Sequence, residues 1–193
     1  KDLHHRLGVT FIYVTHDQAE AMTMSDRVAV MLDGELLQVA PPQQIYADPD
    51  SQRVAEFIGS PKINILQGTV ASGGGVQVGG MRFDIVPGLP AGEAVALGIR
   101  PEAFLAAEPG AAGSVTGRVR FVEHMGSDLY VHLDVEGLAV PVVARLPADH
   151  GFQVQAGQML ALATRPERIL MFDGQGARLR PKAPVTALRE VAR

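Results

Sequence analysis

The feature that most limits the possible folds is the pattern after Ile63, where short apolar segments alternate with glycine-rich turns. Many short strands with turn signals between them are typical of an all-β barrel or sandwich. A short internal similarity, between QGTV at 67–70 and TGRV at 116–119, indicates two related β units. We therefore predict a self-contained antiparallel β unit from about residue 63 to 179. The segments expected to be strands are 65–71, 76–78, 81–86, 94–99, 115–123, 129–135, 138–146, 159–164 and 168–172.

The N-terminal part has a different pattern. Residues 9–15, VTFIYVT, form a continuous β-branched and aromatic run, typical of a strand buried on both faces of a parallel sheet. Asp17 predicts the N-cap of a following helix, and Glu20 completes a capping-box pattern. Residues 2–7 resemble a helix end that Gly8 closes. This order predicts the last part of an α/β unit, with His16 at the turn between strand and helix.

The next segment predicts a hairpin and a linker. Two apolar runs, 27–32 and 35–39, flank Asp33 and Gly34, the residue pair that best fits a type I′ turn. After the hairpin, prolines interrupt the chain, and 43–47 can form one helical turn. Ser51 can cap a second helix that continues through Phe57. We expect this stretch to be a linker packed on the surface.

Composition excludes several classes of function. The 17 Lys and Arg against 21 Asp and Glu give a net charge of −4, which argues against a protein held to nucleic acid by phosphate contacts. The absence of cysteine excludes disulfides, thiolate catalysis and zinc–thiolate sites, and suits a reducing compartment. No apolar run reaches the length of a membrane span, so we expect any membrane role to come through a partner. The first residue is Lys1 rather than Met, as expected of a piece of a longer chain.

Most candidate chemical sites have a simpler explanation. The glycines at 73–75 and 79–80 lack the following Lys of a phosphate-binding loop and predict two hairpin turns. The six histidines lack the spacing of a zinc site. Ser127, Asp128 and His132 lack a nucleophile elbow, so Gly126 and Ser127 predict a turn before a strand. His16 is the remaining candidate, because open α/β sheets place ligand-contacting groups at such strand ends.

Residues 13–31, YVTHDQAEAMTMSDRVAVM, resemble the histidine-switch segment of ATP-binding-cassette transporter ATPases. Further stretches are similar to the importer branch that carries a C-terminal regulatory domain, and to its carbohydrate-uptake group, which includes the maltose and glycerol-3-phosphate importer subunits. The resemblance covers 8–179 and implies an OB-like β domain, often called TOBE. The stretches that carry it are QVAPPQQIY at 38–46, VAEFIGSP at 54–61, GSPKINIL at 59–66, GIRPE at 98–102, VEHMGSD at 122–128 and FDG at 172–174.

The resemblance implies a fold class and a domain division. The expected fold is an α/β remnant of an ATPase domain followed by an all-β, OB-like regulatory domain. Residues 1–60 would end the nucleotide-binding domain, 61–180 would form the regulatory domain, and 181–193 would be a tail, either a short helix or frayed.

The resemblance also implies a role for His16, which would contact the γ-phosphate of ATP and help to orient the attacking water. The family's phosphate-binding loop, glutamine loop, signature and Walker B acidic pair do not occur in these residues. Phosphoryl transfer needs Mg²⁺, a phosphate cradle and an oriented water together, so we expect this chain alone to hydrolyse no ATP. ATP and Mg²⁺ would belong to the longer parent protein, and we expect no protein-bound metal site in this chain.

The implied partners are a second copy of the subunit, two transmembrane permease subunits and, in some members, a regulatory protein or small molecule. The implied location is the cytoplasmic face of the membrane, as a peripheral protein. The competing hypothesis is a stand-alone OB-like module that binds a small oxyanion, an oligosaccharide or nucleic acid. Residues 66–193 contain no Trp and only two long strand segments with Tyr or Phe, near Phe121 and Tyr130, so they offer little for base stacking.

Overall fold

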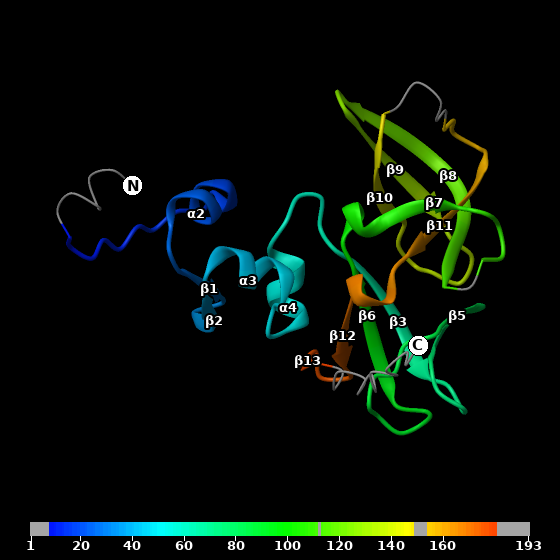
Figure 1. Cartoon of the computed structure of the whole chain (residues 1–193), viewed down its shortest axis with the longest axis horizontal. Helices are drawn as coiled ribbons and strands as arrows, with labels where there is room; N and C mark the ends of the chain where they lie inside the picture. The colour runs from blue at the N-terminus through cyan, green and yellow to red at the C-terminus, as the bar shows by residue number, and fades with distance from the viewer. Residues whose placement is uncertain (1–7, 112, 149–153, 181–193) are drawn as a thin grey trace, which may run out of the picture.

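The computed structural model describes residues 8–111, 113–148 and 154–180. These form a small N-terminal unit and a larger β domain, joined by a linker after the last helix of the small unit (Figure 1). The small unit contains α2 (Gln18–Met24), β1 (Val28–Leu32), β2 (Glu35–Ala40), α3 (Pro42–Ala47) and α4 (Gln52–Phe57).

The small unit is built around the hairpin of β1 and β2. Asp33 and Gly34 have positive φ angles of 52° and 80°, as a type I′ turn requires, so the predicted hairpin is confirmed. One face of the hairpin packs on α3 and α4 in a small core. Its buried members are Val28, Val30, Ala40, Ile45, Val54 and Ile58.

The two short helices begin where the sequence predicts. Pro42 opens α3, where its missing N–H costs nothing. Ser51 caps α4 by accepting a hydrogen bond from the Val54 N–H at 3.3 Å. Val54 faces the small core, whereas Ala55 packs against the β domain.

Two antiparallel sheets make up the β domain. The six-stranded sheet has the order β13-β12-β6-β3-β4-β5, and the five-stranded sheet has the order β10-β9-β8-β11-β7. No helix lies within 115–146, in agreement with the sequence prediction. The strands are β3 (Asn64–Val70), β4 (Val76–Val78), β5 (Met81–Phe83), β6 (Ala94–Ile99), β7 (Phe104–Ala107), β8 (Ser114–Met125), β9 (Asp128–Asp134), β10 (Val142–Pro147), β11 (Met159–Thr164), β12 (Ile169–Asp173) and β13 (Arg178–Leu179).

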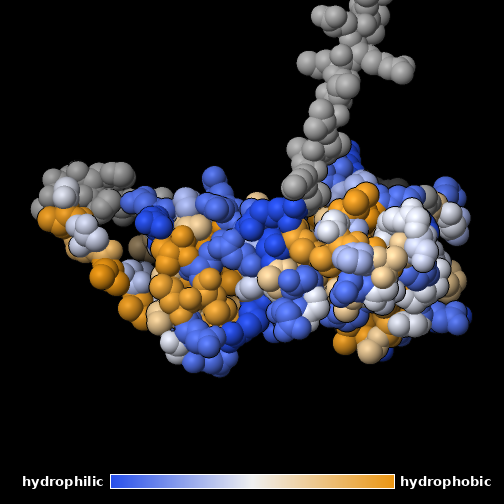
Figure 2. All heavy atoms as spheres, turned by 90° about the horizontal axis from the view of Figure 1, so that it is seen from below, coloured by the Kyte–Doolittle hydropathy of each residue, from blue (hydrophilic) through white to orange (hydrophobic). Residues whose placement is uncertain are grey.

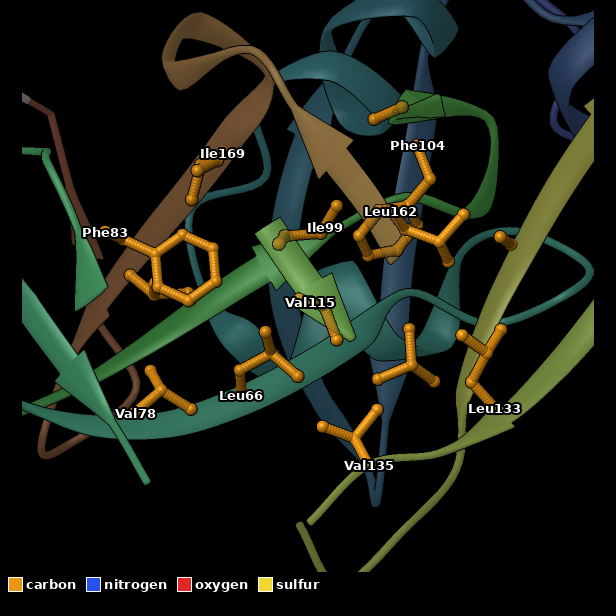
Figure 3. Packing of buried hydrophobic residues seen from close by; sticks show 14 of the residues in the cluster. Leu66, Val78, Phe83, Ile99, Phe104, Val115, Leu133, Val135, Leu162 and Ile169 are labelled. Atoms are coloured by element: carbon orange, nitrogen blue, oxygen red, sulfur yellow. The ribbon is translucent and has the colours of Figure 1, made fainter. Parts of the chain in front are cut away.

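The core of the β domain lies between the two sheets (Figure 3). Leu66 and Ile99 from one sheet and Val115 and Leu162 from the other are at most 2% exposed. Asn64 joins the sheets at one edge. Its Nδ2 donates to the carbonyl oxygens of Ile99 and Val143, both at 2.9 Å, and its Oδ1 accepts from the Val143 N–H at 2.7 Å.

The repeated motif in the sequence corresponds to a repeated close contact. Gly68 on β3 and Gly117 on β8 each lie against a neighbouring strand, so that an added Cβ would meet the Gln77 carbonyl oxygen at 2.5 Å and the Asp134 carbonyl oxygen at 2.6 Å. Both positions therefore require glycine for close approach of backbone to backbone.

Several predicted elements need correction. Residues 9–15 form no strand, and within the described part of the chain the only sheet of the small unit is the antiparallel hairpin. A strand needs a neighbouring strand to accept its backbone hydrogen bonds, and none of the described strands pairs with this segment. The expected parallel α/β remnant is therefore not evident in these residues.

The remaining corrections concern strand ends. The predicted strand 81–86 stops at Phe83, and the predicted strand 138–146 begins only at Val142, after Pro141. The strand β7 was missed, because only its first residue is buried and its pattern is weak. The expected helix end at 2–7 and the tail at 181–193 lie outside the described residues.

Candidate functional site

His16 lies at the turn that leads into α2, between the extended segment 8–15 and the helix. Asp17 is the N-cap, and its Oδ1 accepts from the N–H groups of Ala19 at 2.8 Å and Glu20 at 3.1 Å. The His16 side chain is exposed, and in the described structure it makes no hydrogen bond or ion pair. The local structure thus fixes the backbone beside His16 and leaves the imidazole free to bind.

The predicted capping box does not form, because Glu20 is engaged elsewhere. Its Oε2 accepts hydrogen bonds from the Tyr13 hydroxyl and the Thr15 hydroxyl, both at 2.9 Å. The Thr15 Oγ1 in turn accepts from the Asp17 N–H at 3.0 Å. The hydrogen bond to the Glu20 carboxylate raises the pKa of Tyr13 above its usual value. These contacts tie the segment that precedes His16 to the first turn of α2.

Gln18 connects the start of α2 to the linker. Its Nε2 donates to the Phe57 carbonyl oxygen at 2.6 Å, and its Oε1 accepts from the Gly59 N–H at 2.9 Å. The two partners have opposite polarity, so they fix which side of the carboxamide is oxygen and which is nitrogen. Sequence reasoning missed these contacts, because Gln18 is 39 and 41 residues away from its two partners.

Arg100 binds the same linker from the β domain. Its guanidinium donates to the carbonyl oxygens of Tyr46 at 3.0 Å, Ala55 at 3.3 Å and Ile58 at 2.5 Å. It also lies 4.0 Å above the centre of the Tyr46 ring, a cation–π contact. Burial lowers the pKa of Arg100, which stays protonated as arginine does in proteins. The residue belongs to the GIRPE motif found in the sequence, but its partners were not foreseen.

Tyr46 and Glu102 complete this junction. The Tyr46 hydroxyl donates to the Glu102 Oε1 at 2.6 Å. Burial, followed by the hydrogen bond and the charge of Glu102, raises the pKa of Tyr46 to about 12. The small unit is therefore attached to the β domain by several buried polar contacts as well as by the covalent linker.

The structure does not bring Ser127, Asp128 and His132 together as a catalytic set. Ser127 lies in the turn between β8 and β9, and its hydroxyl donates to the adjacent Asp128 carboxylate at 3.2 Å. His132 instead contacts Glu123 at 2.7 Å and stacks on Phe121 with ring centres 4.0 Å apart. The predicted turn followed by a strand is confirmed.

The surface near His16 is apolar. Figure 2 shows hydrophobic side chains gathered over the small unit, and Ile12 and Val14 are 91% and 90% exposed. Residues 8–15 resemble a buried strand in composition yet remain largely exposed here. Among the described residues, no group of three or more His, Asp or Glu side chains could hold a metal ion. Within the same residues, every helix is too short or too polar to span a membrane.

Comparison with known protein families finds two matching domains. The TOBE domain matches residues 97–172, and the MalK OB fold domain matches residues 59–104. Together the two matches span most of the β domain, which is similar to TOBE and MalK-type OB fold domains. The predicted OB-like β domain is thereby confirmed, and the junction residues Arg100 and Glu102 lie where the two matches overlap.

Curated relatives extend the similarity beyond the TOBE and OB domains. The chain is 39% identical over 179 residues to the sn-glycerol-3-phosphate import ATP-binding protein UgpC of Chromohalobacter salexigens, covering 92% of this chain and 48% of that protein. It is 39% identical over 173 residues to UgpC of Paracoccus denitrificans, covering 90% and 48%. It is 37% identical over 188 residues to the lactose transport ATP-binding protein LacK of Rhizobium radiobacter, covering 92% and 51%.

The predicted resemblance to importer ATP-binding subunits is confirmed by these matches, which favour that hypothesis over a stand-alone binding module. The chain spans about half the length of the curated relatives it matches. The solved structure of the molybdate-binding protein ModG is also similar, at 17% identity and a TM-score of 0.46 over 56% of this chain and 94% of that chain, a likeness too low to inform function.

Proposed function

We propose that this chain is the C-terminal part of the ATP-hydrolysing subunit of an importer for sugars or sugar phosphates. The observation that supports the proposal is the identity of 37–39% to import ATP-binding proteins over at least 90% of the chain. In this proposal residues 1–60 end the nucleotide-binding domain, 61–180 form the regulatory domain and 181–193 are a tail. Residues 1–60 would thus be the remnant of the α/β domain.

His16 is proposed as the catalytic residue of this part. Its exposed imidazole, held at the start of a capped helix, could donate a hydrogen bond to the γ-phosphate of ATP and orient the attacking water. Mg²⁺ would neutralise phosphate charge in such a reaction, but no described cluster of side chains fits a metal ion. The metal ligands and the catalytic carboxylate would therefore come from elsewhere in the longer protein.

The chain alone is proposed to be inactive, because one phosphate-contacting residue cannot supply the cradle that phosphoryl transfer needs. The test is phosphate release by the purified chain in the presence of Mg²⁺-ATP. We expect no turnover above background, and the same result for His16→Ala. Robust turnover that His16→Ala abolishes would contradict the proposal.

The longer protein provides the positive test. An in-frame Walker A motif upstream of the codon for Lys1 is expected, since it would supply the phosphate cradle. In that protein His16→Ala should lower ATP turnover by about 10²-fold or more, as expected for loss of a group that acts on proton transfer or water orientation. A full-length protein without ATP turnover would refute the proposed function.

The proposed partners are a second copy of the subunit and two permease subunits, with the assembly on the cytoplasmic face of the membrane. The exposed apolar side chains on the small unit support an assembly partner, because large apolar surface is costly in water. Co-expression with permease subunits of such an importer and purification of the complex in detergent would test this. Recovery of the subunit only as a free monomer would argue against it.

A further inference from the structure

Residues 57–59 are held from both sides. From the small unit, Gln18 binds the Phe57 carbonyl and the Gly59 N–H. From the β domain, Arg100 binds the Ile58 carbonyl between them. Successive backbone groups of one short segment therefore bond alternately to the two units.

Arg100 is 5% exposed, donates hydrogen bonds to carbonyl oxygens and lies over the Tyr46 ring, and among the described residues it forms no ion pair with a carboxylate. Its carbonyl partners come from the last residues of α3 and α4 and from the residue after α4, where helix carbonyls lack intrahelical partners. A planar fork of donors can serve several carbonyls at once, whereas a lysine ammonium cannot match this geometry. Arg100 is thus built to fix the linker backbone.

Gly59 shows how closely the guanidinium fits. Its φ of +113° is unfavourable for other residues, and an added Cβ would lie 2.9 Å from the Arg100 Nη1. A side chain at 59 would therefore displace the guanidinium or the backbone that Gln18 binds. The close approach of Arg100 and the conformation that Gln18 recognises depend on the same glycine.

We propose that Arg100 is a positioning residue for His16, acting through residues 57–59 and Gln18. Gln18 is the first residue of α2 and lies two positions after His16, so the hydrogen bonds of its carboxamide to 57 and 59 hold the start of the helix beside the turn that carries His16. The contacts form a continuous path from the β domain to the candidate catalytic side chain. The inference rests on the proposed role of His16 in ATP hydrolysis, but the contacts themselves can be tested without nucleotide.

The first test follows the His16 ring resonances by NMR in the 193-residue chain. Arg100→Lys keeps the positive charge but loses the planar set of guanidinium donors. We expect it to shift the His16 signals in the same direction as Gln18→Ala does. Arg178→Lys is the matched control, because Arg178 is also a largely buried cation, and it contacts the small unit through Asp48 and not through 57–59. The control should leave the His16 signals in place.

A double-mutant cycle distinguishes positioning from a general loss of stability. If Arg100 acts through Gln18, the shift at His16 in Arg100→Lys/Gln18→Ala equals that of Gln18→Ala alone, since the path is already broken. Additive shifts, or unchanged His16 signals in folded Arg100→Lys, overturn the proposal. Should Arg100→Lys fail to fold, Arg100→Gln takes its place, because it keeps a single amide donor and removes the planar set of guanidinium donors, and the same outcomes apply.

The longer protein gives a separate readout. Arg100→Lys should lower kcat for ATP by up to about 10²-fold, the effect of a small misplacement of a reacting group. KM for ATP should stay unchanged, because Arg100 does not touch the nucleotide. Absence of ATP turnover in the unsubstituted protein would refute the proposed function while leaving the NMR result valid. Equal kcat with and without the substitution would overturn the positioning role.

Discussion

Asn64 provides the sharpest test of how the two sheets of the β domain are joined. The substitution Asn64→Ala removes three hydrogen bonds, two donated to the Ile99 and Val143 carbonyl oxygens and one accepted from the Val143 N–H. Each such bond contributes about 1 kcal/mol net, and the Val143 N–H, which is only partly buried, adds no more than about 1 kcal/mol when it loses its partner. We therefore expect a loss of about 3–4 kcal/mol in the free energy of unfolding.

The assay is urea unfolding of the whole chain followed by far-ultraviolet circular dichroism. With a slope of about 2 kcal/mol per molar urea, the expected loss moves the midpoint down by about 1.5–2 M. Gln67→Ala is the matched control, because Gln67 lies on the same strand and is exposed. The control should change the free energy of unfolding by less than about 0.5 kcal/mol.

The Asn64→Asp variant separates hydrogen bonding from side-chain volume. It keeps the shape of the side chain but places a carboxylate oxygen against two carbonyl oxygens, so it should destabilise at least as much as Asn64→Ala at neutral pH. A loss below about 1 kcal/mol in Asn64→Ala, with an unchanged slope, would show that Asn64 does not join the sheets.

Three further predictions concern other parts of the fold. In a spectrophotometric titration the tyrosinate of Tyr46 should form last, near its pKa of about 12, and Tyr46→Phe should remove that step. Folding raises this pKa from 10.0, so the protonated hydroxyl contributes its full stability below about pH 10 and loses it between pH 10 and 12. The urea midpoint of the unsubstituted chain should therefore fall over this range more than that of Tyr46→Phe. Equal falls of the two midpoints would contradict the assignment. Gly68→Ala should lower the free energy of unfolding in urea by about 1–3 kcal/mol, because its Cβ would meet a carbonyl oxygen. Gly80→Ala is the control and should lower it little, because open space surrounds Gly80. Equal losses in the two variants would refute the close contact at Gly68. Ile45→Ala should cost about 2–5 kcal/mol in the unfolding of the small unit, measured by amide exchange there; a change in exchange only in the β domain would contradict its place in the core.

The hairpin of the small unit and many strands of the β domain can be predicted from the sequence, because their turns are marked locally. Asp33 and Gly34 specify a hairpin through their own backbone preferences, whatever surrounds them. In the same way, glycine turns between apolar segments mark β3, β4 and β5. These signals depend on neighbours in the chain, so they can be read without knowing the fold.

The sequence predictions fail where the local structure depends on residues that are distant in the sequence. Residues 9–15 have the composition of a buried strand, but composition does not provide the neighbouring strand that would pair with them. The capping box was predicted from the spacing of Asp17 and Glu20, yet the Glu20 carboxylate binds hydroxyls of Tyr13 and Thr15. At the candidate site, His16 was found from its local sequence motif. The hydrogen bonds of nearby Gln18 to the linker were not, because they join residues about forty positions apart.

The helix α4 is shared by two cores, since Val54 belongs to the core of the small unit and Ala55 to a cluster on the β domain with Ile63 and Phe172. A helix of six residues is too short to be stable in water without packing. It therefore exists only while both of its faces are covered, and opening of either core removes the support of the other. A partner that loosens one unit would therefore also weaken the packing of α4 on the other unit.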